Sequence, residues 1–173
     1  MQTMANIKLT QHINGRILLF AAAVALLLGF PMFMLLRAAW NRGIEDHGTY
    51  QKVDLKALGN FDFDGNQGTL ADIPPHFRKL DGQRVLLRGE MYNPLALRGI
   101  NDFQLVYSIQ KCCFGGPPRV QERVFARLPS GRTTSISDSL VDVMGTLHVN
   151  PLREGDAIVS VYTLDVESIQ AVR

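Results

Sequence analysis

Apolar and polar side chains alternate with a period of two over most of the second half of the chain, which predicts strands with one buried face. In residues 140–150, Val141, Val143 and Leu147 fall on one side and His148 on the other. The other segments that read as strands are 83–92, 102–110, 119–128 and 157–172. The sequence therefore predicts a mainly β domain with five strands.

The second of these segments, DFQLVYSIQ, sets four apolar residues at every other position. These residues are Phe103, Leu105, Tyr107 and Ile109. The prediction is a strand with all four on its buried face.

The order of the elements predicts the architecture. Residues 135–140 (SISDSL) are long enough for one helical turn with Ser135 at the N-cap. Three strands, a short helical connection and two more strands are the order of an OB-fold, a five-stranded Greek-key barrel. Gly89 and Gly145 fall inside the first and fourth strands, where a small barrel bends. We expect a five-stranded OB-like β-barrel, with an open sandwich or a meander as the alternative.

A second pattern precedes the domain. Residues 17–36 run for twenty positions without a charge or an amide, enough for a helix to cross a hydrocarbon layer of about 30 Å. Trp40 follows where an aromatic anchor would sit. The run exceeds the usual apolar region of a cleaved signal peptide. We predict a cytoplasmic leader over 1–16 and a transmembrane helix over 17–40.

Lysine and arginine flank this helix on both sides, so the positive-inside rule does not fix its orientation. A short leader, one apolar helix and then the whole domain are the usual layout of a signal anchor. The prediction is a single-pass protein of the bacterial inner membrane with its domain facing the periplasm.

The polar stretch 41–72 is predicted to be a linker, and 73–173 the barrel domain. Pro74 and Pro75 mark the boundary, since prolines favour an extended chain and stop a helix. The piece DFDGN at 62–66 lacks the spacing and the terminal glutamate of a calcium loop, so it reads as a solvated turn.

Charge excludes one class of partner. Residues 1–44 hold four Lys and Arg and no acid, which leaves 14 basic residues against 16 acidic ones in the rest of the chain. A nucleic-acid-binding face needs dense positive charge, so no nucleic acid is expected. The chain also carries no nucleophile elbow, phosphate-binding loop or zinc-protease helix, and we predict that it is not an enzyme.

The only two cysteines, Cys112 and Cys113, are adjacent in the segment KCCFGGPP. Three interpretations stay open. The cysteines can pack as small apolar residues, bind zinc or copper together with His148, or form a redox or intermolecular disulfide. The turn that follows them is rigid and suits contact with a partner. Its residues are Phe114, Gly115, Gly116, Pro117 and Pro118.

The run IPPHFRKLDGQRVLLRGEMYNP, followed by FQLV and then CCFGGPPRVQERV, resembles a bacterial family of unknown function, DUF3299. The resemblance covers residues 73–128 and extends weakly to the C-terminus. The matching positions of the turn are Cys113, Phe114, Gly115, Pro117 and Pro118. Members of the family look like small exported or membrane-anchored proteins, and some are encoded beside permeases of ABC transporters. The resemblance thus implies an envelope role.

These observations predict a non-enzymatic, membrane-anchored binding protein, an accessory component of an ABC-type transport system. One alternative is a structural assembly subunit that acts through small residues of its helix, Ala21 to Ala25 and Gly29. Another is a barrel that binds a small ligand or an oligosaccharide.

Overall fold

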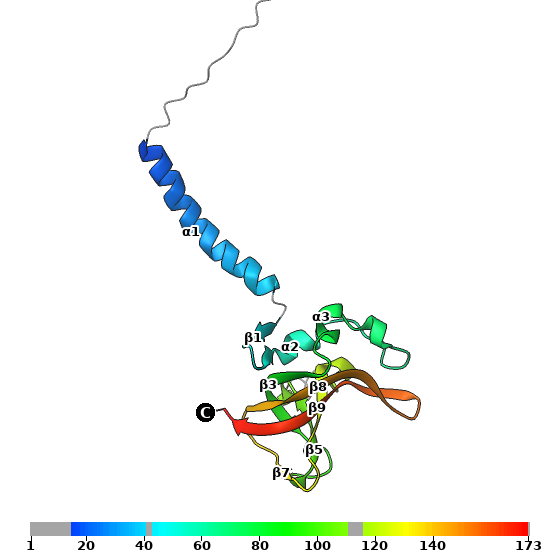
Figure 1. Cartoon of the computed structure of the whole chain (residues 1–173). Helices are drawn as coiled ribbons and strands as arrows, with labels where there is room; N and C mark the ends of the chain where they lie inside the picture. Colours follow the sequence, from blue (N-terminus) through cyan, green and yellow to red (C-terminus); the bar gives the residue numbers. More distant parts are fainter. Residues whose placement is uncertain (1–14, 41–42, 111–115, 173) are drawn as a thin grey trace, which may run out of the picture. The chain divides into compact units, whose positions relative to one another are not determined.

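The computed structural model describes residues 15–40, 43–110 and 116–172. The chain divides into two compact units, Met1–Asn41 and Arg42–Arg173 (Figure 1).

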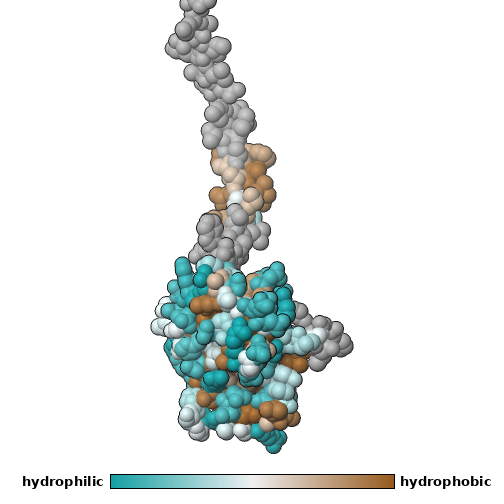
Figure 2. All heavy atoms as spheres, turned by 90° about the vertical axis from the view of Figure 1, so that its right-hand side faces the viewer, coloured by the Kyte–Doolittle hydropathy of each residue, from teal (hydrophilic) through white to brown (hydrophobic). Residues whose placement is uncertain are grey.

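The described residues of the first unit form helix α1, over Gly15–Trp40. Its 26 residues include Pro31 and correspond to about 39 Å of helix. Its large apolar side chains, where described, are exposed; they include Leu19, Phe20, Leu26, Leu27, Leu28, Phe30, Met32 and Phe33. Figure 2 shows mainly hydrophobic side chains on the coloured part of this helix and a mostly hydrophilic visible face on the second unit. Within the described residues, no helix is both long and apolar enough to cross a membrane.

The second unit is mainly β. Its elements in chain order are β1 (Ile44–Asp46), β2 (Gln51–Val53), α2 (Leu55–Leu58), η1 (Leu70–Asp72), α3 (Pro75–Arg78), β3 (Gln83–Tyr92), β4 (Arg98–Ile100), β5 (Asp102–Val106), η2 (Val120–Glu122), β6 (Arg123–Arg127), β7 (Thr134–Ser135), β8 (Val141–Glu154) and β9 (Ala157–Ala171).

The main sheet has the strand order β1-β2-β3-β5-β6-β9-β8. Its strands β3, β5, β6, β8 and β9 fall in the five predicted segments, but β5 ends at Val106 and β6 begins only at Arg123, after η2. Neighbours pair antiparallel from β3 to β5 and from β5 to β6, parallel from β6 to β9, and antiparallel from β9 to β8. Strand β8 also pairs with β3, so the sheet curves into a partial ring.

Two glycines allow the strands to bend. Strand β3 pairs with β8 up to Gly89 and with β5 from Glu90 onward. A Cβ atom on Gly89 would lie 2.5 Å from the carbonyl oxygen of Val106, closer than side chains tolerate. Gly145 lies at a register shift between β8 and β9, where a Cβ would collide with the carbonyl of Asp165. Both positions therefore need glycine because another backbone approaches closely.

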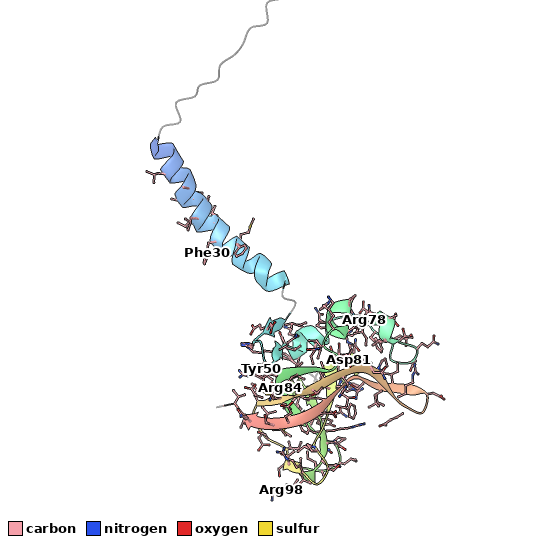
Figure 3. The ribbon with its side chains drawn as sticks, viewed as in Figure 1. Phe30, Tyr50, Arg78, Asp81, Arg84 and Arg98 are labelled. Carbon is pink, nitrogen blue, oxygen red and sulfur yellow. The ribbon has the colours of Figure 1, made fainter. Side chains whose placement is uncertain are left out.

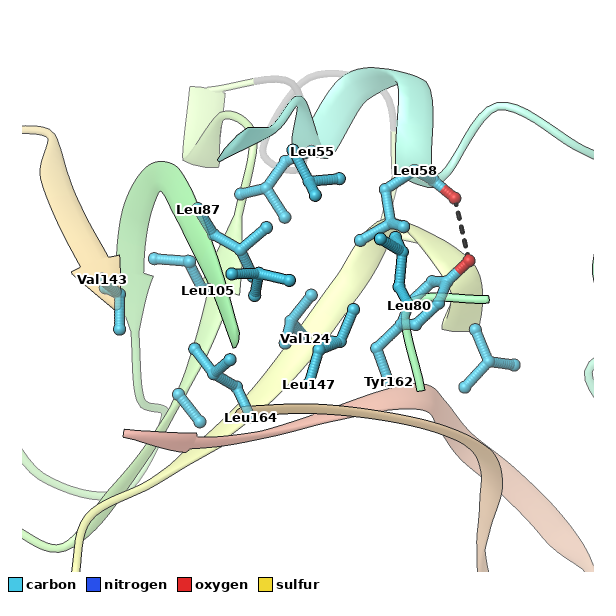
Figure 4. Packing of buried hydrophobic residues seen from close by; sticks show 14 of the residues in the cluster. Leu55, Leu58, Leu80, Leu87, Leu105, Val124, Val143, Leu147, Tyr162 and Leu164 are labelled. Carbon is cyan, nitrogen blue, oxygen red and sulfur yellow. Dashed lines mark hydrogen bonds between the residues drawn. The ribbon is translucent and has the colours of Figure 1, made fainter. Parts of the chain in front are cut away.

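The core fills the ring. On β8, Val141, Val143, Leu147 and Val149 are buried, as the alternation predicts, and His148 is exposed. These residues pack with the inward side chains of the other strands, including Leu87, Leu105, Val124, Tyr162 and Leu164 (Figure 4).

Residues 43–72 belong to the same compact unit, so the folded domain begins well before the boundary expected at residue 73. Strand β2 pairs in parallel with β3, and α2 lies across one end of the ring (Figures 1 and 4). Val53, Leu55 and Leu58 are buried there. The Asp54 side chain caps α2 by accepting a hydrogen bond from the backbone N–H of Lys56, at 2.9 Å.

The helical turn predicted over 135–140 is wrong. Thr134–Ser135 forms strand β7, which pairs with β4, and the backbone N–H of Ile136 donates to the carbonyl of Leu97 at 2.9 Å. The loop after β3 supplies this partner strand, which the local sequence around Ser135 does not reveal.

The expectation that Pro74 and Pro75 stop any helix is also wrong. Helix α3 begins at Pro75, because the first helical position needs no amide hydrogen bond and favours the φ of proline. Phe77 of this helix and Leu80 just after it are buried against the core.

Candidate functional site

A hollow of about 340 Å³ lies beside α2; we call it the first hollow. Its lining comes from three segments: residues 55–56 of α2, residues 106–108 at the end of β5, and the segment 116–119 with Glu122. This volume is within the range of small-ligand pockets.

Two close contacts position α2, which supplies part of this lining. The Tyr162 hydroxyl donates to the carbonyl oxygen of Leu58 at 3.1 Å, which ties α2 to strand β9 (Figure 4). At the end of α2, a Cβ on Gly59 would lie 2.9 Å from the Cα of Glu122, so η2 packs directly against the backbone there. The geometry of the hollow thus depends on contacts with the core.

The floor of the first hollow is apolar and its rim is cationic. Leu55 and Val106 are buried beneath it, whereas Tyr107 is 49% exposed. The Lys56 ammonium nitrogen lies 5.8 Å from the centre of the Tyr107 ring, within cation–π range. No ion pair joins Lys56 to a carboxylate in the described part of the chain.

Arg119 is the second cation of the rim. Its guanidinium lies 3.2 Å from a carboxylate oxygen of Glu122 and 3.9 Å from one of Asp62. The Glu122 carboxylate also accepts the backbone N–H of Arg119 at 3.0 Å, which fixes the start of η2. The charge of Arg119 is therefore largely balanced by carboxylates of the same chain.

A second hollow, of about 390 Å³, shares Tyr107 with the first. Both cations of its described lining are paired with carboxylates. Arg88 donates two hydrogen bonds to the Asp142 carboxylate, at 2.7 and 2.8 Å, and Lys52 lies 3.2 Å from Glu45. The hydrogen bonds from Arg88 hold the pKa of Asp142 below its ordinary value, with burial opposing them. An anionic ligand in this hollow would therefore have to compete with Asp142 for Arg88 or with Glu45 for Lys52.

An exposed apolar loop lies at the other end of the unit, where Arg98 is found far from Tyr50 (Figure 3). Leu95 is 93% exposed and Leu97 69% exposed. The Asn93 side chain orders the loop by accepting the backbone N–H groups of Leu95 and Ala96, at 2.8 and 3.1 Å.

The acidic segment 62–66 forms a turn, as predicted. Asp64 accepts the backbone N–H groups of Asn66 and Gln67 at 2.8 and 3.1 Å, and these bonds lower its pKa. Within residues 15–40, 43–110 and 116–172, no group of three or more His, Cys, Asp or Glu side chains is arranged to hold a metal ion.

The predicted site residues are only partly described. Cys112, Cys113, Phe114 and Gly115 lie outside the described residues, so the metal and partner predictions for them are untested. The other predicted partner residues, Gly116, Pro117 and Pro118, line the first hollow.

His148, the proposed third metal ligand, is exposed on β8, and its Nε2 lies 3.0 Å from a carboxylate oxygen of Asp165. The residues described around the first hollow do not include it.

Sequence reasoning missed Lys56 and misplaced Tyr107. Lys56 falls in the stretch predicted as a linker. Tyr107 was expected on the buried face, but β5 ends at Val106 and the alternation ends with it: Leu105 and Val106 are both buried, and Tyr107 points outward. Leu105 and Val106, two consecutive apolar residues, break the period of two in the sequence and could have indicated that the strand ends before Tyr107.

No family model matches the chain, and no curated protein matches it. Among solved structures, the crystal structure of a DUF3299 family protein (PA4066) from Pseudomonas aeruginosa PAO1 is similar, with a TM-score of 0.50 and 16% sequence identity. The match covers 73% of this chain and 98% of that one. At this identity the likeness concerns the fold. It supports the resemblance to the DUF3299 family that the motifs of residues 73–128 suggest.

Proposed function

We propose that the chain is a membrane-anchored, non-enzymatic binding protein whose β-rich unit docks a partner at the first hollow. One observation carries the proposal: an apolar floor, an exposed aromatic ring, two prolines and a lysine that pairs with no carboxylate of the described residues meet in one concave surface. Exposed aromatic residues beside apolar pockets are typical of recognition sites.

The ring of five strands is, in this proposal, an OB-like β-barrel. Its support is the order of pairing, β3-β5-β6-β9-β8 and back to β3, with the parallel pair between the third and fifth strands. This is a Greek-key arrangement in which strands distant in sequence close on each other. The first hollow lies beside one end of this arrangement, next to α2.

Helix α1 is the proposed anchor in the bacterial inner membrane, with the β-rich unit in the periplasm. The support is the apolar run 17–36, which lies within α1, and the exposure of the large apolar side chains described on it. Such a surface is stabilised by lipid or by another apolar helix.

A binding role is favoured over catalysis by the chemistry of the first hollow. The described residues that line it include no histidine, cysteine or aspartate, and its one carboxylate, Glu122, is held by Arg119. Its hydroxyls belong to Tyr107 and Ser108, and no histidine of the described lining is present to activate them, so these groups suit recognition better than proton transfer or nucleophilic attack.

The proposed partner is a membrane protein of an ABC-type transport system, which the family resemblance implies. The test uses tagged full-length protein purified in mild detergent from native membranes, as wild type, Tyr107→Ala and Tyr92→Ala. Tyr92 is a matched control because it is 43% exposed and lines neither hollow. We expect a membrane protein to co-purify with wild type and with Tyr92→Ala and to be lost with Tyr107→Ala.

Two results would redirect the proposal. A partner that survives Tyr107→Ala but disappears when residues 17–36 become polyleucine would favour assembly through the helix. A hollow that retains a small molecule instead of a protein would favour the ligand-binding alternative, which the volume of about 340 Å³ also suits.

A further inference from the structure

We infer that the first hollow recognises an acidic peptide segment in which a carboxylate lies next to an aromatic or aliphatic side chain. This inference rests on the proposed docking function and names the chemistry that the partner presents there.

The charge of the hollow favours an anion. Among its described lining residues the charged side chains are Lys56, Arg119 and Glu122, two cations and one anion. Arg119 and Glu122 satisfy each other, so Lys56 carries the remaining positive charge. Nearby on β3, the Glu90 carboxylate accepts the backbone N–H of Ile109, and among the described residues it forms no ion pair with Lys56. Lys56 is thus the cation available to a carboxylate that enters the hollow, because no carboxylate of the described residues pairs with it.

The position of Lys56 suits a ligand that is partly apolar. Its ammonium group lies over the Tyr107 ring, so a carboxylate bound to it is also close to an aromatic face. Leu55 and Val106 form an apolar floor, and Pro117 adds an apolar wall. A side chain adjacent to the carboxylate can therefore leave water while the charge remains at the rim.

The second hollow provides an internal comparison. It shares Tyr107 and has a similar volume, but Arg88 is engaged by Asp142 and Lys52 by Glu45. A carboxylate would have to displace an existing acid there. Selectivity for the first hollow follows from the free charge on Lys56, since the aromatic ring is common to both.

The test uses two peptides that differ only in charge, N-acetyl-Phe-Asp-amide and N-acetyl-Phe-Asn-amide. They are titrated at pH 7 into the ¹⁵N-labelled full-length chain in detergent micelles, and the amide resonances of Tyr107, Ser108 and Gly116 are followed. We expect saturable shifts with the aspartate peptide and binding at least about tenfold weaker with the asparagine peptide.

Substitutions then test whether Lys56 causes the preference for the aspartate peptide. Lys56→Gln should remove the preference for aspartate, and Lys56→Arg should retain most of it. Lys79→Gln is the matched control, because Lys79 is an exposed lysine that lines neither hollow, and it should behave as wild type. Equal binding of the two peptides, no binding of either, or an equal loss in Lys79→Gln would overturn the inference.

The inference and the docking function fail in different ways. If the aspartate peptide does not bind but Tyr107→Ala still loses the co-purified partner, docking stands and carboxylate recognition is rejected. If the peptide binds through Lys56 but Tyr107→Ala keeps the partner, carboxylate recognition stands and protein docking at this hollow is rejected.

Discussion

The Tyr162 hydroxyl on β9 donates a hydrogen bond to the carbonyl oxygen of Leu58, the last residue of α2, at 3.1 Å. Tyr162 is fully buried, and burial raises the pKa of its hydroxyl, so the group remains a neutral donor. Because α2 also carries Leu55 and Lys56, this bond links the core of the ring to the floor and rim of the first hollow.

The first prediction concerns this bond. Tyr162→Phe keeps the ring but removes the donor and leaves a buried carbonyl without it, so we expect the free energy of unfolding to fall by about 1–2 kcal/mol. Urea denaturation measures the change. Tyr92→Phe, at a partly exposed tyrosine, should change the free energy of unfolding by less than about 0.5 kcal/mol. Equal effects of the two substitutions would show that the Leu58 contact contributes little.

The second prediction concerns the bend in β3. Gly89→Ala places a methyl group 2.5 Å from the Val106 carbonyl oxygen and 2.6 Å from a methyl carbon of Leu55. The backbone must shift, and we expect a loss of about 1–3 kcal/mol in the free energy of unfolding. Gly65→Ala is the control, since its nearest neighbour, a methyl carbon of Val120, is 3.8 Å away. A Gly89→Ala protein as stable as Gly65→Ala would contradict the close approach.

The third prediction separates the ring of Tyr107 from its hydroxyl. Tyr107→Phe preserves the aromatic face beneath Lys56 and should leave partner affinity within about twofold. Tyr107→Ala removes the face and should weaken binding by at least tenfold, as at other aromatic interface anchors. Both variants should unfold near the wild-type midpoint because the side chain is 49% exposed. Quantitative co-purification and thermal unfolding check these expectations. If Tyr107→Phe is as defective as Tyr107→Ala, the hydroxyl rather than the ring makes the contact.

The fourth prediction is a dependence on pH. Arg88 lowers the pKa of Asp142 in the folded chain below the unfolded value of about 4. The pair therefore contributes stability that is fully present above about pH 4–5 and is lost as the pH falls through the folded pKa. Arg88 is 52% exposed, so the contribution is at most about 1 kcal/mol.

Unfolding free energies between pH 2.5 and 6 measure this contribution. Asp142→Asn should be less stable than wild type at pH 6 and approach it at the acid end. Asp138→Asn, at an exposed aspartate, serves as the control. A constant difference between wild type and Asp142→Asn across this range would exclude the ion pair as its cause.

The sequence predicts the strands because burial imposes a period of two on them. Val141, Val143 and Leu147 line the core as their alternation indicates, and Gly145 lies at a register shift between β8 and β9. The prediction fails where a distant segment decides the conformation. Ser135 is drawn into a strand by β4, which lies more than thirty residues earlier in the chain.

The site was harder to predict because its residues come from separate segments. Lys56 reaches the hollow only because α2 folds over the ring, held by Leu58 and Tyr162. The proline turn stands out in the sequence, and Pro117 and Pro118 line the hollow, while their contact with a partner stays a prediction. Tyr107 was misplaced because the strand ends one residue before it.

The measurement that tests the central claim most directly is photocrosslinking in living cells. A benzophenone amino acid replaces, one at a time, Tyr107 in the first hollow, Leu140 in the second hollow and Leu95 in the exposed loop of the full-length chain. We predict a covalent adduct with a membrane protein from position 107, a weaker adduct from 140, which lines the hollow that shares Tyr107, and none from 95. An adduct from position 95 alone would contradict the account and move the binding surface to the opposite end of the domain.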